Sequence, residues 1–352
     1  MDINELLKTA IEQNASDLHL TVNVPPIIRV NGHLQQISET VLTREFVADL
    51  AEQILGEKQK EVFERRGEVD FSHSVAGFGR FRVNVFRQRG TPALSIRIIP
   101  PKVLTPEELG LPDTVKSLAR KPNGLVLVTG PTGSGKSTTL AALIDLLNRE
   151  ISGHIITLED PIEFLHTHKK CIVNQREIGL DSDNFPNALR AALRQDPDVI
   201  LVGEMRDLET IATAITAAET GHLVFATLHT SSAAQTIDRI IDVFPPHQQN
   251  QVRVQLSLIL QGIVAQTLLP RADGPGRVVA TEMMAATPAI RNLIREGKTP
   301  QINTVIQSGA KYGMQTMDSS LKELYQQGII SYEEACKRVT DLENFNRMVQ
   351  GF

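Results

Sequence analysis

Apolar positions in the first hundred residues change repeatedly between helical and strand-like spacing. They recur every three or four residues over 3–11, which predicts a helix, and a second, more polar helix is expected over 43–66. Alternation of apolar and polar positions predicts strands over 18–22, 27–30, 78–89 and 93–99. The pair Asn31-Gly32 predicts a hairpin turn, because both residues tolerate a positive φ angle. These elements predict a small α+β domain over residues 1–100.

Prolines mark the end of this domain. The last strand runs into Pro100-Pro101, and the segment up to Pro112 also carries Pro106 and Gly110. Proline fixes φ and removes a hydrogen-bond donor, so such a segment disfavours helix and is stiff. We therefore interpret residues 101–112 as a linker to a second domain over 113–352.

Beyond the linker the pattern becomes strand, loop and helix in repetition. Short apolar runs predict buried strands over 125–129, 154–158, 199–202 and 223–228. Helical stripes follow the first run and the third, the latter with Asp207 as its N-cap and Gly221 beyond its end. Alternating strands and helices predict an α/β domain with a parallel sheet flanked by helices. From residue 286 onward the chain reads as mainly helical.

Composition narrows the class of protein. The 352 residues are 41% hydrophobic and 22% charged, which is typical of ordinary globular domains, and the length favours two of them. The formal net charge of -5 argues against a protein that coats duplex DNA. Cys171 and Cys336 are the only cysteines, so neither a disulfide framework nor a cysteine zinc site is expected.

Two segments bear on targeting. Residues 1–10 carry Asp2 and Glu5 and lack a basic stretch before an apolar core, so no signal peptide is expected. The most apolar segment, 256–269, is interrupted by Gln261 and Gln266 and is too short to span a bilayer, which takes about 20 apolar residues. These features predict a soluble, cytoplasmic protein.

A phosphate-binding loop follows the first predicted strand of the second domain. The sequence from Gly130 to Ser137 matches G-x-x-x-x-G-K-[ST] in full, between an apolar strand and an apolar-striped helix. The glycines let backbone N–H groups surround a phosphate at the N-terminus of the next helix. Lys136 would reach the β- and γ-phosphates, and the Ser137 hydroxyl would ligate Mg²⁺. The predicted ATP-binding residues are Gly130, Pro131, Thr132, Gly133, Ser134, Gly135, Lys136, Ser137 and Thr138.

Carboxylates follow two of the predicted strands, where ligands of α/β sheets bind. Glu159, Asp160 and Glu163 come directly after the strand over 154–158, a grouping that suits a general base, although acidic residues also form solvated turns. Glu204 comes after the strand over 199–202, where a carboxylate would hold Mg²⁺ or its water. Gly203 stands where many such strands have an aspartate, so Glu204 is the predicted metal-supporting acid.

Histidines stand at both ends of the strand over 223–228. His229 follows it, on the side of the phosphate site, and is the better candidate for a contact to the γ-phosphate. His222 precedes the strand, and a structural role is about as plausible for it as a functional one. With two histidines and no cysteine nearby, no zinc site is expected.

Arginines gather on two neighbouring strands of the small domain, namely Arg80, Arg82, Arg87, Arg89 and Arg97. They could form a nucleic-acid face with Phe78, Phe81 and Phe86, a solvated strand face, or a set of arginine fingers for a neighbouring subunit. Alternation places Phe81 on the core side, away from Arg82, which weakens the nucleic-acid interpretation. The other two remain equally supported, and Arg82 and Arg97 are the candidate fingers.

The motifs together resemble the bacterial type II/IV secretion ATPase superfamily. The resemblance rests on the phosphate loop, the acidic segment 159–163, the strand ending at Glu204 and the histidine segment 222–229. Residues 15–20 and 25–32 are similar to that family's small N-terminal domain. Within the superfamily, residues 289–296 resemble the C-terminal signature of the members that retract type IV pili, although their periodicity alone indicates an ordinary packing helix.

This resemblance implies a RecA-like P-loop NTPase domain preceded by a PAS-like domain, assembled into a hexamer that hydrolyses ATP with Mg²⁺. It implies that Glu163 is the general base, Glu204 the Walker B acid and His229 a γ-phosphate contact. It further implies pilus retraction and twitching motility, a platform protein of the inner membrane as partner, and a cytoplasmic location peripheral to that membrane. Neither nucleic acid nor zinc is implied.

Two other functions stay open at this stage. Pilus extension or secretion ATPases share the catalytic core, but the extension members typically carry a longer N-terminal region and a tetracysteine zinc motif. The two distant cysteines here favour the retraction members. A RecA-like nucleic-acid motor is the less favoured alternative, since the net charge is acidic.

Overall fold

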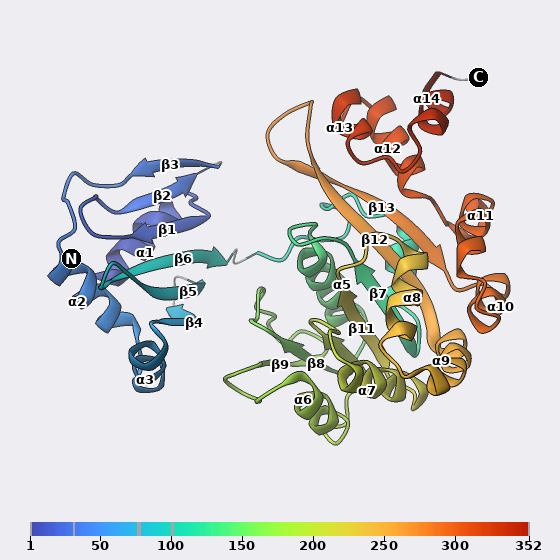
Figure 1. Ribbon diagram of the computed structural model, residues 1–352, viewed down its shortest axis with the longest axis horizontal. Coiled ribbons are helices and arrows are strands. Elements are labelled where there is room, and N and C mark those ends of the chain that lie inside the picture. Colours follow the sequence, from blue (N-terminus) through green and yellow to red (C-terminus); the bar gives the residue numbers. More distant parts are fainter. Residues whose placement is uncertain (1, 31, 76–78, 100–101, 351–352) are drawn as a thin grey trace. The chain divides into compact units, whose positions relative to one another are not determined.

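The chain divides into two units in the computed structural model, which describes residues 2–30, 32–75, 79–99 and 102–350 (Figure 1). One unit comprises residues 1–102 with 163–165, and the other 103–162 with 166–352. Residues 102–112 form loop and turns that lead into helix α4 (Asp113–Ala119). Four residues on which predictions fell, Asn31, Phe78, Pro100 and Pro101, lie outside the described residues.

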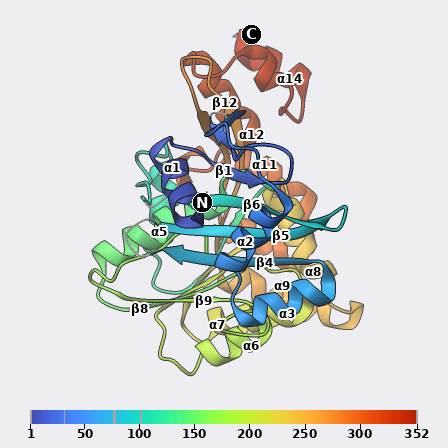
Figure 2. The ribbon, with the colours of Figure 1, turned by 90° about the vertical axis from the view of Figure 1, so that its left-hand side faces the viewer.

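The first unit is an antiparallel sheet with helices on one face. Its strand order is β3-β2-β1-β6-β5-β4. The strands are β1 (Asp17–Leu20), β2 (Ile27–Val30), β3 (His33–Gln36), β4 (Glu68–Val75), β5 (Gly79–Gln88) and β6 (Thr91–Ile99). Helices α1 (Ile3–Glu12) and α2 (Arg44–Ile54) lie over the same side of the sheet (Figure 2) and share its apolar core.

Alternation along β5 decides which face that core covers. Phe81, Val83 and Val85 are fully buried, whereas Arg82, between the first two, is exposed, as the sequence predicts. The polar helix expected over 43–66 is in fact two helices, α2 and α3 (Glu57–Arg66), because Leu55 leaves helical geometry and Gly56 starts a new helix. Strand β4 was not predicted.

The second unit contains a seven-stranded sheet in the order β13-β12-β7-β11-β10-β8-β9. Neighbouring strands run parallel except for the edge strand β13, which is antiparallel to β12. The strands are β7 (Gly124–Thr129), β8 (His154–Glu159), β9 (Ile172–Glu177), β10 (Val199–Val202), β11 (Leu223–Leu228), β12 (Leu260–Pro270) and β13 (Arg277–Ala285). The predicted α/β class, a parallel sheet preceded by a small α+β domain, is confirmed.

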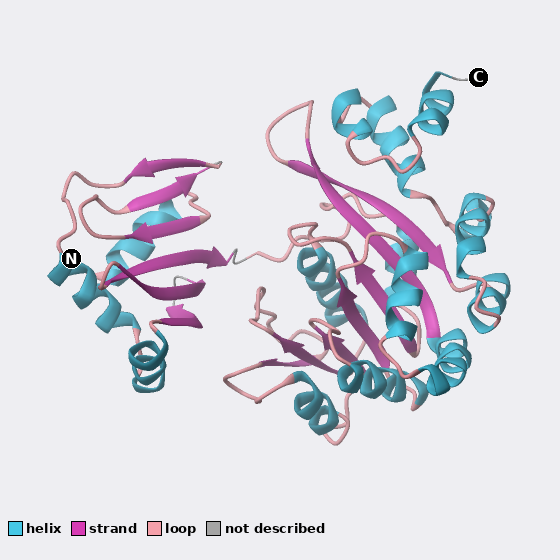
Figure 3. Cartoon of the chain, viewed as in Figure 1, coloured by secondary structure: helices cyan, strands magenta, loops and turns pink. Residues whose placement is uncertain are grey.

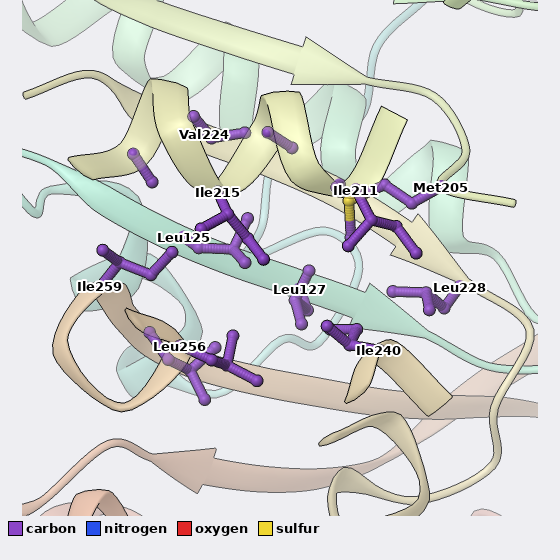
Figure 4. Packing of buried hydrophobic residues seen from close by; sticks show 14 of the residues in the cluster. Leu125, Leu127, Met205, Ile211, Ile215, Val224, Leu228, Ile240, Leu256 and Ile259 are labelled. Carbon is purple, nitrogen blue, oxygen red and sulfur yellow. The ribbon is translucent and has the colours of Figure 1, made fainter. Parts of the chain in front are cut away.

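Helices cover both faces of this sheet (Figure 3). On one face, α7 (Leu208–Glu219) and α9 (Pro246–Ile259) pack on Leu125, Leu127 and Val224 (Figure 4). On the other, α4 and α5 (Lys136–Glu150) pack on Val126 and Val128. Side chains on adjacent positions of β7 therefore enter different cores, which explains why the strand reads as continuously apolar.

The remaining helices of this unit lie over 185–192 and 233–242, where none was predicted, and after residue 286, where they agree with the predicted helical end of the chain. They are α6 (Phe185–Ala192), α8 (Ala233–Asp242), α10 (Pro288–Arg295), α11 (Ile302–Gln307), α12 (Met317–Gln326), α13 (Tyr332–Cys336) and α14 (Leu342–Gln350). Asp207 caps α7 as predicted, accepting a hydrogen bond from the backbone N of Thr210. Among the described residues, none of the helices is both long and apolar enough to cross a bilayer.

Candidate nucleotide-binding site

The phosphate loop joins β7 to α5 and needs its glycines for steric reasons. Gly130, Gly133 and Gly135 have φ angles of +145°, +79° and +90°, a region that other residues rarely adopt. A Cβ atom on Gly130 would lie 2.3 Å from the backbone O of Gln266 and 2.5 Å from Ser134 Oγ. The loop can therefore turn tightly at the N-terminus of a 15-residue helix, whose positive end attracts phosphate.

Lys136 is held against this loop. Its Nζ donates to the backbone O of Gly130 (2.8 Å) and of Pro131 (3.1 Å), and its side chain is buried. Ser137 and Thr138 follow in the first turn of α5 and are half-buried. The lysine charge and the Ser137 hydroxyl thus lie at the same end of the helix.

Gln266 of β12 is hydrogen-bonded to the phosphate loop and was not predicted as a site residue. Its Nε2 donates to the backbone O of Ser134 over 2.8 Å, and the side chain is 2% exposed. The signal was visible in the sequence as a polar residue that interrupts the apolar segment 256–269. A buried amide in a central strand needs a hydrogen-bonding partner, and here the partner is the phosphate loop.

Glu204 and His229 meet at the carboxyl edge of the sheet. They follow β10 and β11, which are parallel neighbours, so the fold brings them together. His229 Nε2 lies 2.8 Å from Glu204 Oε1, and His229 Nδ1 lies 3.4 Å from Lys136 Nζ. The imidazole of His229 therefore lies between the lysine of the phosphate loop and the carboxylate of Glu204.

Arg206 is a second partner of Glu204 that sequence reasoning missed. Its guanidinium Nε donates to Glu204 Oε1, and most of the Arg206 side chain is exposed. Burial pushes the pKa of Glu204 upward, but the hydrogen bond from Arg206 and the neighbouring positive charges outweigh it, so the pKa lies below its ordinary value. Glu204 is thus held as a carboxylate, the form that ligates a cation.

The acidic segment after β8 is anchored by side chains of β9. Glu159 Oε1 accepts hydrogen bonds from Thr157 Oγ1 (2.6 Å) and Gln175 Nε2 (3.3 Å). The buried Glu177 accepts a hydrogen bond from the backbone N of Ile162 over 3.1 Å, which fixes the residue just before Glu163. Gln175 and Glu177 were not predicted, since β9 itself was not.

Glu163 lies in the loop that these contacts hold. Its side chain is half-buried, and within the described residues it forms no hydrogen bond or ion pair. The same loop is tied to α5, where the buried Asn148 donates to the backbone O of Thr167 and accepts from the backbone N of Lys169. Residues 167 and 169, which follow Glu163 in the chain, are therefore joined to the helix that follows the phosphate loop.

His222 lies at the other end of β11 and contacts the end of α7. Its Nδ1 lies 2.9 Å from the backbone O of Ala217 and 3.2 Å from Thr220 Oγ1, at the end of α7. Asp198, at the same end of the sheet, accepts a hydrogen bond from the backbone N of His154 over 2.8 Å. Neither side chain is near the carboxyl edge where Glu204 and His229 lie.

The five arginines of the first unit do not form one group. Arg82 of β5 and Arg97 of β6 are exposed and directly opposite each other. Arg87 instead lies over the Phe63 ring, 5.3 Å from its centroid, and Arg89 lies in the turn after β5 with a φ of +48°. The structure therefore separates the two predicted fingers from Arg87 and Arg89.

Comparison with known proteins gives consistent results. Residues 1–338 match the family described as type II/IV secretion system protein. The type IV pilus retraction ATPase PilT of Pseudomonas aeruginosa is 55% identical over 345 residues, which cover 98% of this chain and 100% of that protein. A twitching motility protein of Neisseria gonorrhoeae is 49% identical over 344 residues, covering 98% of this chain and 92% of that protein. A crystal structure of the pilus retraction motor PilT with bound ADP aligns with a TM-score of 0.93 at 51% identity, covering 99% of this chain and 100% of that one.

Proposed function

The chain belongs to the type II/IV secretion system protein family and is an ATPase, and we propose that it is a hexameric motor that powers retraction of type IV pili. The observation that carries the proposal is the chain of contacts from Lys136 through His229 to Glu204 at the end of the phosphate loop. It joins a phosphate-binding cation to an acid that can support a metal ion. The similarity to retraction motors over nearly the whole chain favours retraction, rather than extension, of the pilus.

Different residues of the site bind the phosphates of ATP and its Mg²⁺ ion. The loop from Gly130 to Gly135 and the N-terminus of α5 hold the phosphates, and Lys136 offsets their charge. The Ser137 hydroxyl and the Glu204 carboxylate are hard oxygen ligands that suit Mg²⁺, which neutralises charge on the β- and γ-phosphate oxygens when bound. In the part of the chain that the structure describes, no three His, Cys, Asp or Glu side chains gather into a metal site. Two protein ligands fit an ion that is otherwise held by phosphate and water.

Hydrolysis needs a group that takes a proton from the attacking water. We assign this role to Glu163, whose loop is fixed by Glu177 on one side and Asn148 on the other. His229 is the γ-phosphate contact, since its ring lies beside Lys136 at the end of the phosphate loop. Glu204 orients that imidazole and completes the metal site.

Assembly into a hexamer would give the two exposed arginines of the first unit a role. In a hexamer, Arg82 and Arg97 of one copy would reach the phosphates bound by the next and stabilise charge that develops during hydrolysis. The protein on which the motor acts is an inner-membrane platform protein of the pilus machine. The motor therefore acts at the cytoplasmic side of that membrane, without crossing it.

Deleting the gene in its host tests the direction of work. We expect cells that still carry pili, even in larger numbers, but cannot retract them and do not twitch. The measurement is pilus imaging together with a twitching assay, with complementation by the wild-type gene as control. A deletion strain without pili would show that the chain extends pili instead.

Arg97→Ala is expected to lower hydrolysis about tenfold to a hundredfold, less than the roughly 10³-fold of a single arginine finger, because Arg82 shares the role. The loss should depend on assembly. Mixing Arg97→Ala subunits with Lys136→Ala subunits should restore activity, because an intact arginine of one then faces an intact nucleotide site of the other. The measurement is phosphate release as a function of the mixing ratio, and a strictly additive result would place Arg97 in its own subunit's site.

A further inference from the structure

A row of charged side chains runs across the open face of the first unit's sheet. Arg97 of β6 has Arg82 of β5 directly opposite on one side and Asp17 of β1 directly opposite on the other. Like charges at opposed positions are unfavourable in a sheet. The arrangement therefore costs stability, and Asp17 is the group that offsets it.

Asp17 holds Arg97 in one defined way. Arg97 Nε lies 3.0 Å from Asp17 Oδ1, and Ser16 Oγ donates to Asp17 Oδ2 over 2.8 Å, so both carboxylate oxygens are engaged. The Asp17 side chain is 13% exposed, whereas that of Arg97 is 65% exposed. The carboxylate is thus the fixed partner, and the guanidinium is the part that reaches outward.

The contact uses the nitrogen nearest to the chain. Guanidinium has five N–H donors in a planar fork, and binding through Nε leaves the terminal amino groups at the exposed end. Those groups are the ones that pair with two phosphate oxygens at once. Arg29, opposite Asp17 on β2, is engaged differently, since its Nη1 donates to the backbone O of Gly32 over 2.8 Å.

We propose that Asp17 is a positioning residue for Arg97, which it orients toward a phosphate of the nucleotide bound by a neighbouring copy. The inference rests on the proposed role of Arg97 across the subunit interface. It gives a task to the segment Ala15–Leu20, which the sequence singles out and which the nucleotide site does not use. Its basis is the ion pair together with the unfavourable neighbour Arg82.

Asp17→Asn tests the proposal in the full-length protein. The amide keeps the size of the side chain but loses the charge that holds guanidinium, so kcat should fall about tenfold, as misplacement of a catalytic group does, while KM for ATP stays unchanged. Because the Arg97 side chain is 65% exposed and its charge is screened by water, the melting temperature should fall only slightly, and the oligomeric state should not change. Asp70→Asn is the matched control, because Asp70 is exposed on β4 of the same sheet and lies opposite Asn84.

The double variant decides whether Asp17 acts through Arg97. If it does, Asp17→Asn adds no further loss to Arg97→Ala. An additional tenfold loss in that background, or an equal loss for Asp70→Asn, would overturn the proposal. Unchanged kcat in Asp17→Asn beside a lowered kcat in Arg97→Ala would overturn it while leaving the role of Arg97 intact. Unchanged kcat in both variants would remove the role of Arg97 as well, so the two failures are distinguishable.

Discussion

Lys136→Ala is expected to weaken ATP binding at least about 100-fold and to leave no measurable hydrolysis, because charge-assisted contacts to phosphate are the strong ones. The buried ammonium group is fixed against the loop through the backbone O of Gly130 and of Pro131. The variant also removes the contact to His229. Calorimetric titration with a slowly hydrolysed ATP analogue measures the binding loss, and phosphate release measures the loss of turnover.

Lys298→Ala is a suitable control for this result. Lys298 lies in the same unit, is 53% exposed and pairs with Glu296 at the surface. Removing a lysine there leaves the charge near the phosphate loop unchanged, so binding should equal that of the wild type. ATP binding by Lys136→Ala as tight as that of the wild type would contradict the assignment of the phosphate loop.

The central strands of the second unit, and the candidate site residues that follow their carboxyl ends, could be predicted from the sequence. β7, β8, β10 and β11 are buried along their whole length apart from the ends of β8, so each reads as a continuous apolar run. In a parallel sheet their carboxyl ends share one edge. Placing Glu204 and His229 at the same edge of the sheet follows from that rule, and their 2.8 Å contact arises because β10 and β11 are neighbours.

The strands that escaped prediction lack such a run. β9 at one edge of the sheet alternates buried Val173 with exposed neighbours and carries polar residues, so it resembles loop. β12 follows α9 without a break, since Leu260 ends the helix and starts the strand. No turn residue separates the two, and periodicity over the joint apolar segment cannot show where one ends.

Contacts between distant segments are the part that a single sequence cannot supply. Gln266 and Ser134 are 132 residues apart, and Arg97 and Asp17 are 80 apart. Each pair forms only because strand order and register bring two elements together. The residue types were visible, as a polar residue in an apolar run and an acid just before a predicted strand, but their partners were set by tertiary structure.

Glu163→Gln is the substitution that tests the chemical step itself. The amide fills the same space and leaves the loop contacts through Ile162 in place, but it cannot accept the proton of the attacking water. We expect ATP affinity close to the wild-type value and kcat lower by roughly 10²- to 10⁴-fold. Single-turnover phosphate release beside equilibrium binding separates the two quantities.

Glu204→Gln should differ from Glu163→Gln in how its loss of turnover depends on the Mg²⁺ concentration. It too should keep binding and lose turnover, but because Glu204 is assigned to the metal site, its loss should diminish as the Mg²⁺ concentration rises, whereas that of Glu163→Gln should not. Glu219→Gln, at the surface end of α7, is the control and should behave as the wild type. Wild-type hydrolysis in Glu163→Gln would exclude it as the general base. Equal Mg²⁺ dependence in the Glu163 and Glu204 variants would mean that the two carboxylates do not have separate roles.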